Sequence, residues 1–194
     1  MEWVCQSLLH LDTYQCVIRR VAAAALFALV PEAEPHVAHL RELFDPAARR
    51  GLGAHITIVY PLLTPGLLDE RALRSITEVA AGLEPFRFRL THVARFPSTI
   101  YLAPKPASRF IVMHDAFRTA FPGPDANPHQ PYVPHLSVAR DGTGEEYGVE
   151  AELKSLLARA GPIECACGKL SLMENGSGLW REVCAFELGH GVGD

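Results

Sequence analysis

The chain has 194 residues, of which 48% are hydrophobic and 21% are charged, and its formal net charge is −4. This length and composition suffice for one folded domain with a sizeable core, so bulk disorder is excluded. The slight acidic excess argues against a protein that wraps long duplex nucleic acid, because such proteins neutralise phosphates with surplus Lys and Arg. A small or terminal phosphate-bearing ligand remains compatible with this charge.

Residues 1–20 do not continue the regular succession of predicted strands and helices that begins at residue 21. We therefore expect an N-terminal extension at 1–20 before a single domain at 21–190. The apolar run at 21–30 comes after two arginines, like the core of a signal peptide, but it begins too late and Pro-Glu-Ala-Glu-Pro replaces a cleavage site. It is also too short to span a bilayer, so it predicts a buried strand. Five cysteines without a Cys-x-x-Cys pair are typical of reduced thiols. We therefore expect a cytoplasmic protein with no membrane anchor, no metal and no cofactor.

Taken in chain order, the pattern predicts alternating strands and helices and then a final hairpin. Apolar or β-branched runs predict strands, and apolar side chains at helical spacing predict helices. The predicted order is strand 22–30, helix 32–44, strand 55–60, helix 67–83, strands 86–92 and 99–103, helix 107–121, strand 135–139, helix 145–160, and strands 163–173 and 179–188. The block at 22–103 is echoed, without its first strand, at 107–188. Hairpins mixed with helices favour an α+β fold over a doubly wound parallel sheet.

Two of the nine histidines are followed at i+2 by a hydroxyl residue: His55 by Thr57, and His135 by Ser137. Each segment runs His, aliphatic, hydroxyl, aliphatic, and each comes after a Gly- or Pro-rich loop at an equivalent point of the weak duplication. Side chains at i and i+2 of a strand project to the same face. Each strand therefore presents an imidazole beside a hydroxyl, with aliphatic residues facing the core.

This arrangement suits phosphodiester chemistry without a metal. One histidine can deprotonate the nucleophile while the other protonates the leaving oxygen, because both titrate near neutral pH. The hydroxyls can hydrogen-bond the non-bridging oxygens. Further candidates for substrate contact lie near the motifs: Tyr60 and Tyr132 could stack on a base or simply pack, and Arg140 and Arg95 could reach the phosphate or lie at the surface.

The pair of motifs, with Tyr60-Pro61 after the first and Pro134 before the second, resembles the 2H phosphoesterase superfamily. It is most similar to the bacterial branch named for 2′-5′ RNA ligase and RNA 2′,3′-cyclic phosphodiesterase. The resemblance covers roughly 22–188 and departs from the common pattern only mildly, with serine at position 137. It implies a bilobal fold of two pseudo-symmetric lobes of antiparallel sheet with flanking helices around a central cleft. It also implies an acid–base pair of His55 and His135, with Thr57 and Ser137 as phosphate-binding hydroxyls.

The substrate implied by the resemblance is an RNA end or small nucleotide bearing a 2′,3′-cyclic phosphate or a 2′-5′ phosphodiester. We expect the protein to act as a monomer. The same chemistry run backwards would join RNA ends. Three alternatives stay open: a phosphoesterase for a non-RNA cyclic nucleotide, a non-catalytic RNA- or nucleotide-binding module, and a metalloprotein that uses both histidines. The last lacks a convincing third ligand.

Overall fold

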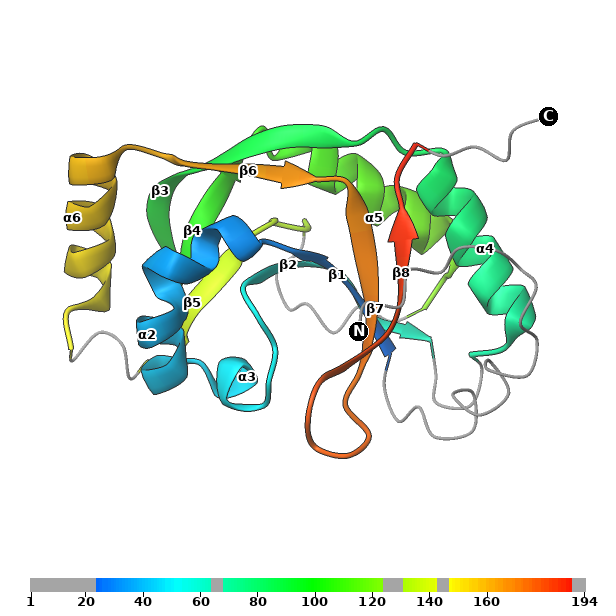
Figure 1. The fold of residues 1–194 in the computed structure, drawn as a ribbon, viewed down its shortest axis with the longest axis horizontal. Helices are drawn as coiled ribbons and strands as arrows, with labels where there is room; N and C mark the ends of the chain where they lie inside the picture. Colours follow the sequence, from blue (N-terminus) through cyan, green and yellow to red (C-terminus); the bar gives the residue numbers. More distant parts are fainter. Residues whose placement is uncertain (1–23, 64–67, 124–130, 143–146, 190–194) are drawn as a thin grey trace.

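Two four-stranded antiparallel sheets form the framework of the protein (Figure 1). The structure is a computed structural model, and it describes residues 24–63, 68–123, 131–142 and 147–189. The first sheet has the order β2-β1-β7-β8, with β1 at Ala24–Leu29, β2 at His55–Leu63, β7 at Lys169–Glu174 and β8 at Arg181–Glu187. The second has the order β5-β4-β3-β6, with β3 at Phe86–Phe96, β4 at Thr99–Lys105, β5 at Leu136–Arg140 and β6 at Ile163–Cys167. The predicted α+β class is confirmed.

Helices cover both sheets, two on each. Against the second sheet pack α2 (Glu34–Phe44), which contacts β5, and α6 (Val149–Ala160), which contacts β3. Against the first sheet pack α4 (Glu70–Ala81), which contacts β8, and α5 (Ser108–Ala120), which contacts β2. Figure 1 shows the two pairs of helices at opposite ends of the molecule. Two short elements, η1 (Pro31–Ala33) and α3 (Pro46–Arg49), precede and follow α2.

The two sheets repeat one arrangement, which explains the weak duplication. In each, the strand of a histidine motif is at the edge and pairs antiparallel with an inner strand, β2 with β1 and β5 with β4. The unit β1-α2-β2-α4 is repeated as β4-α5-β5-α6. The first strand of the second copy, which is missing from a copy that begins at residue 107, is therefore β4. The first helix of each unit crosses to the other sheet, because α2 contacts β5 and α5 contacts β2.

The prediction of one continuous strand at 163–173 is wrong, because this segment forms two strands that belong to different sheets. β6 pairs with β3, whereas β7 pairs with β1 and β8, and Gly168 lies between them. β6 alternates buried and exposed residues, while β7 is an inner strand with an almost continuously buried run. Gly168 has open space around it, and its carbonyl accepts a hydrogen bond from the Leu188 N–H at 2.8 Å. The pairing partners, which are remote in sequence, decide this break.

The apolar run that begins the domain is buried on both faces of the first sheet. Ala24, Leu26 and Ala28 join the main core, whereas Ala25 and Phe27 belong to a smaller cluster on the opposite face. Burial on both faces removes the alternation that a half-buried strand would show. Throughout the described residues, every helix is too short or too polar to cross a membrane. The predicted extension at 1–20 lies outside the described residues.

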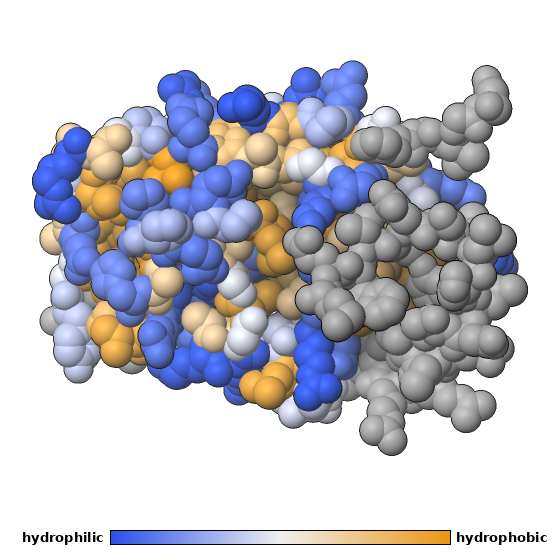
Figure 2. Space-filling view, in the orientation of Figure 1, coloured by the Kyte–Doolittle hydropathy of each residue, from blue (hydrophilic) through white to orange (hydrophobic). Residues whose placement is uncertain are grey.

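On the face shown in Figure 2, hydrophilic and hydrophobic residues are interspersed over the described part of the chain. Within the described ranges, the large hydrophobic side chains that are exposed come from several places in the fold: Leu43, Ile111, Val112, Tyr147 and Leu179. They lie on α2, on α5, before α6 and between β7 and β8. Scattered residues of this kind are ordinary on a protein surface and need no docking partner.

Candidate active site

The two histidine motifs meet where the sheets adjoin. β2 and β5 are edge strands of different sheets, and they contact each other. His55 is the first residue of β2, and His135 immediately precedes β5 instead of opening it. The charge on His135 is close enough to lower the pKa of His55. Residues about 80 positions apart in the chain are therefore neighbours in the fold.

Each imidazole is held by the same local hydrogen bond. The Nδ1 atom of His55 lies 2.8 Å from the carbonyl oxygen of Gly53, and Nδ1 of His135 lies 2.8 Å from that of Val133. A carbonyl oxygen only accepts, so Nδ1 carries the proton in both rings. The ring nitrogen that is not bonded to this carbonyl is therefore Nε2 in both motifs.

An aromatic ring on the neighbouring strand supports each imidazole. Phe27 stands opposite Thr57 across β1 and β2, and its ring packs edge-on against His55 with centroids 4.6 Å apart. Tyr101 stands opposite Ser137 across β4 and β5, and its centroid is 5.2 Å from that of His135. Phe96 adds an edge contact to His135 at 5.0 Å. These contacts restrict both rings, as acid–base geometry requires.

The two hydroxyl residues differ in their surroundings. Ser137 is buried, and its Oγ accepts a hydrogen bond from Nη2 of Arg140 at 3.1 Å. Since that bond uses an oxygen lone pair, the Ser137 hydroxyl proton is left to be donated elsewhere. Thr57 is half-buried, and its backbone carbonyl accepts from the Tyr132 hydroxyl at 2.6 Å. Arg140, which the sequence predicted as a phosphate contact, is thus hydrogen-bonded to the hydroxyl of the second motif.

His55 is held in its neutral form. Its side chain is 4% exposed, and burial is the largest cause that lowers its pKa to about 3. The positive charges of Arg41, Arg140 and His135 lower it further, while the bond to the Gly53 carbonyl opposes them. A buried imidazole among positive charges loses its proton because the cation is poorly solvated and repelled. At neutral pH the Nε2 of His55 has a free lone pair.

The other predicted contact residues have structural partners. Tyr132 is buried and stacks on His114 with ring centroids 4.1 Å apart, so packing is the interpretation that the geometry favours over base stacking. Arg95 lies on β3, and its Nη1 is 4.0 Å from the Glu150 carboxylate of α6. Tyr60 is only partly buried and packs edge-on against Trp180 at 6.0 Å. Tyr60 keeps surface that a substrate base could contact.

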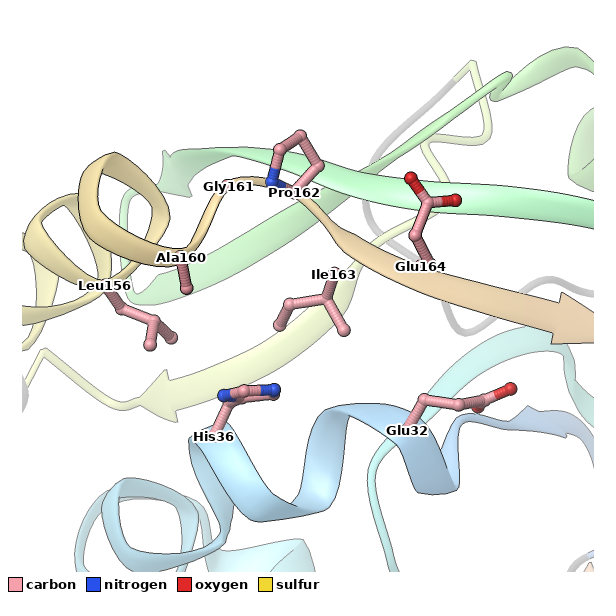
Figure 3. Close-up of a pocket in the computed structure, with 8 residues that line it drawn as sticks. All are labelled: Glu32, His36, Leu156, Ala160, Gly161, Pro162, Ile163 and Glu164. Atoms are coloured by element: carbon pink, nitrogen blue, oxygen red, sulfur yellow. The ribbon is translucent and has the colours of Figure 1, made fainter.

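A pocket of about 220 Å³ is lined by residues outside the motifs. It lies between η1 and α2 on one side and the segment that joins α6 to β6 on the other (Figure 3). Glu32 and His36 line one wall, facing Ile163 and Glu164 on the other. Neither histidine motif contributes to it. Among the residues that the structure describes, His, Cys, Asp and Glu nowhere form a group of three suited to a metal ion.

The sequence model of the 2′-5′ RNA ligase superfamily matches residues 29–179, which include both histidine motifs. The chain belongs to this superfamily. Its 2H phosphoesterase character, inferred from the two motifs, is thereby confirmed. Membership in a superfamily of phosphoesterases and ligases makes the chain an enzyme of that general type. A comparison with proteins of curated function found no match.

Solved structures of similar fold bear out the architecture of this superfamily member. E. coli LigT in complex with NADP+ is 16% identical, with a TM-score of 0.58, and covers 87% of this chain and 98% of its own. TT0787 of Thermus thermophilus is 17% identical, with a TM-score of 0.55, and covers 86% of this chain and 98% of its own. LigT has also been solved with ATP, at 16% identity and a TM-score of 0.57. At such identities the likeness establishes the shared fold.

Several residues of the candidate site were not recognised from the sequence. Phe27 carried a signal, since it is the lone aromatic in an alanine-rich run. Tyr101 could have been found from the predicted pairing of its strand with that of Ser137. Arg41 and Asp45 gave no signal, because charges at i and i+4 usually belong to a solvated helix face. Their burial beside the motifs depends on how α2 docks onto β5.

Proposed function

We propose that the protein is a metal-independent phosphodiesterase that acts on 2′,3′-cyclic phosphates or 2′-5′ linked RNA and nucleotides. The observation that carries the proposal is the matched pair of imidazoles, each bonded through Nδ1 to a carbonyl and each within electrostatic reach of the other. Two such groups can flank one phosphate, with proton transfer assigned to their Nε2 atoms. The reverse reaction, which joins RNA ends through a 2′-5′ bond, uses the same groups.

The electrostatics support different roles for the two histidines. His55, which is neutral at neutral pH, takes a proton from the attacking water as the water oxygen bonds to phosphorus. The bond from phosphorus to one ribose oxygen breaks, and His135 gives its Nε2 proton to that leaving oxygen. Ser137, Thr57 and Arg140 donate hydrogen bonds to the non-bridging oxygens, where negative charge increases in the transition state. Proton exchange with water restores both histidines.

The test is turnover of a substrate panel in the presence of excess EDTA. The panel contains a nucleoside 2′,3′-cyclic phosphate, a 2′-5′ linked dinucleotide, its 3′-5′ isomer and a non-RNA cyclic nucleotide. We expect hydrolysis of the first two and little of the 3′-5′ isomer. Binding without any turnover would favour the non-catalytic module, and activity that EDTA abolishes and a divalent ion restores would favour the metalloprotein. Turnover of the non-RNA compound alone would favour a phosphoesterase for a non-RNA cyclic nucleotide.

The pH dependence of kcat/KM provides a second check. The pKa of about 3 for His55 keeps the base deprotonated, so the rate is expected to hold as the pH falls from 7 to about 5. The rate is expected to fall on the alkaline side, where the acid has lost its proton. The measurement is a pH–rate profile on the cyclic phosphate. An acidic limb near the ordinary histidine pKa of about 6.5 would contradict the assignment of His55 as base.

Removing one hydroxyl should cost less than removing a histidine. A neutral hydrogen bond contributes about 0.5–1.5 kcal/mol, so Thr57→Ala and Ser137→Ala should each lower kcat/KM by ~2–10-fold. The effect of Ser137→Ala should be the larger, because its hydroxyl also holds Arg140. Steady-state kinetics of both variants check this. A larger loss than in the histidine variants would show that the hydroxyls have a different role.

The proposed partner is an RNA end or a small nucleotide, and we propose that the protein acts as a monomer in the cytoplasm. Two of the described cysteines support a reducing compartment, since Cys165 and Cys167 are buried free thiols. Burial, with nearby carboxylates, raises the pKa of the Cys165 and Cys167 thiols to about 12. These two thiols are therefore protonated at neutral pH and poor nucleophiles.

A further inference from the structure

A buried ion pair at the C-terminal end of α2 lies between the two histidine motifs. Arg41 is 1% exposed and donates to Oδ2 of Asp45 through Nε at 3.2 Å and Nη2 at 2.9 Å. Asp45 is fully buried. Buried ion pairs of this kind rarely add net stability, because desolvation offsets their attraction. Their presence therefore points to a requirement for geometry at this place.

On one side the pair holds the loop before His55. Nη2 of Arg41 donates to the Leu52 carbonyl at 3.0 Å, and Nη1 lies 3.7 Å from the Glu34 carboxylate. That carboxylate accepts a hydrogen bond from the N–H of Ala54, the residue before His55. A methyl group on Gly53 would lie only 3.0 Å from the same oxygen, so the loop passes close to α2.

On the other side the pair reaches the second motif. Oδ1 of Asp45 lies 3.7 Å from Nε of Arg140, whose Nη2 donates to Ser137. The same oxygen accepts from the N–H of Ala47 and caps α3. One carboxylate thus lies between two guanidinium groups, one on the side of each histidine motif.

We propose that Asp45, bridging Arg41 and Arg140, is a positioning residue that aligns Arg140 and Ser137 with the loop that carries His55. The inference rests on the proposed phosphodiester chemistry. Arg140 has a side chain that is 39% exposed, so losing the carboxylate 3.7 Å from its Nε removes one constraint on how it is turned toward Ser137. Misplacing groups that hold the phosphate weakens transition-state binding far more than it weakens folding.

The test is a double-mutant cycle with Asp45→Asn and Arg140→Ala. Asparagine removes the charge but keeps an oxygen for the Ala47 cap. We expect Asp45→Asn to lower kcat/KM, and the affinity for adenosine 3′-monophosphate measured by calorimetry, by ~10–100-fold in the natural sequence. In the Arg140→Ala background the same change should cost less than about 3-fold, because Asp45 acts through Arg140. Equal losses in both backgrounds would overturn the inference, as would no loss at all.

Three further measurements separate this inference from folding and from the proposed function. Asp69→Asn, which alters the aspartate that caps α4 by accepting from the Ala72 N–H, should leave kinetics unchanged. If Asp45→Asn fails to fold, the double variant Arg41→Met/Asp45→Asn replaces it in the double-mutant cycle, because removing both charges leaves neither of them buried without its partner. If the natural protein turns over no substrate, the proposed function fails, while a crystal structure of the asparagine variant still decides the inference. Arg140 still bonded to Ser137 there would refute it.

Discussion

Replacing His55 or His135 is expected to lower kcat on a 2′,3′-cyclic phosphate by ~10²–10⁴-fold, the usual contribution of a positioned acid or base. Asparagine is the better replacement for His55, because its amide can keep a donor near the Gly53 carbonyl while it cannot accept a proton as Nε2 does. The control is His92→Asn, which alters an exposed strand histidine on β3 that contacts Thr91. That variant should match the natural protein.

The two roles can be separated by the leaving group. A nitrophenyl phosphodiester releases an anion that needs no proton, so His135→Ala should recover most of its loss on this substrate, whereas a His55 variant should not. The comparison uses the ratio of rates on the nitrophenyl and cyclic substrates for each variant. Recovery in the His55 variant instead would exchange the acid and base assignments.

Acid should destabilise the protein through His55. Its pKa is about 3 in the folded state and about 6.5 when unfolded, so below pH 6.5 the unfolded chain binds a proton that the folded protein excludes. The stabilisation is complete above pH ~6.5 and is lost as the pH falls toward 3, by about 1.4 kcal/mol per pH unit and roughly 4–5 kcal/mol in all. The measurement is urea unfolding of the natural protein between pH 7.5 and 4.

The variant His55→Asn isolates this contribution, because every carboxylate that titrates in the same range is common to both proteins. It should lose less stability per pH unit than the natural protein, whereas His92→Asn should follow the natural protein. Parallel pH dependences in the natural protein and the His55 variant would mean that the imidazole is not held neutral by burial.

Local patterns allowed much of the fold to be predicted. The helices and most strands follow from side-chain periodicity, which the chain carries residue by residue. The strand at 163–173 failed because its two halves pair with different sheets, and no local signal records partners so far away. Tyr132 illustrates the same limit, since its contacts with His114 and with the Thr57 carbonyl join three distant segments.

The sequence by itself determined which groups could do the chemistry. A histidine and a hydroxyl at i and i+2, repeated in matched contexts, are a property of the chain, and they sufficed to identify the superfamily. Only the tertiary structure decided that His55 is held neutral and what holds Arg140 beside Ser137. Burial and charge at His55 come from α2, β1 and β5, and Asp45 meets Arg140 only because α2 docks across the sheets. A pKa depends on the whole surroundings of a group, and those surroundings exist only after folding.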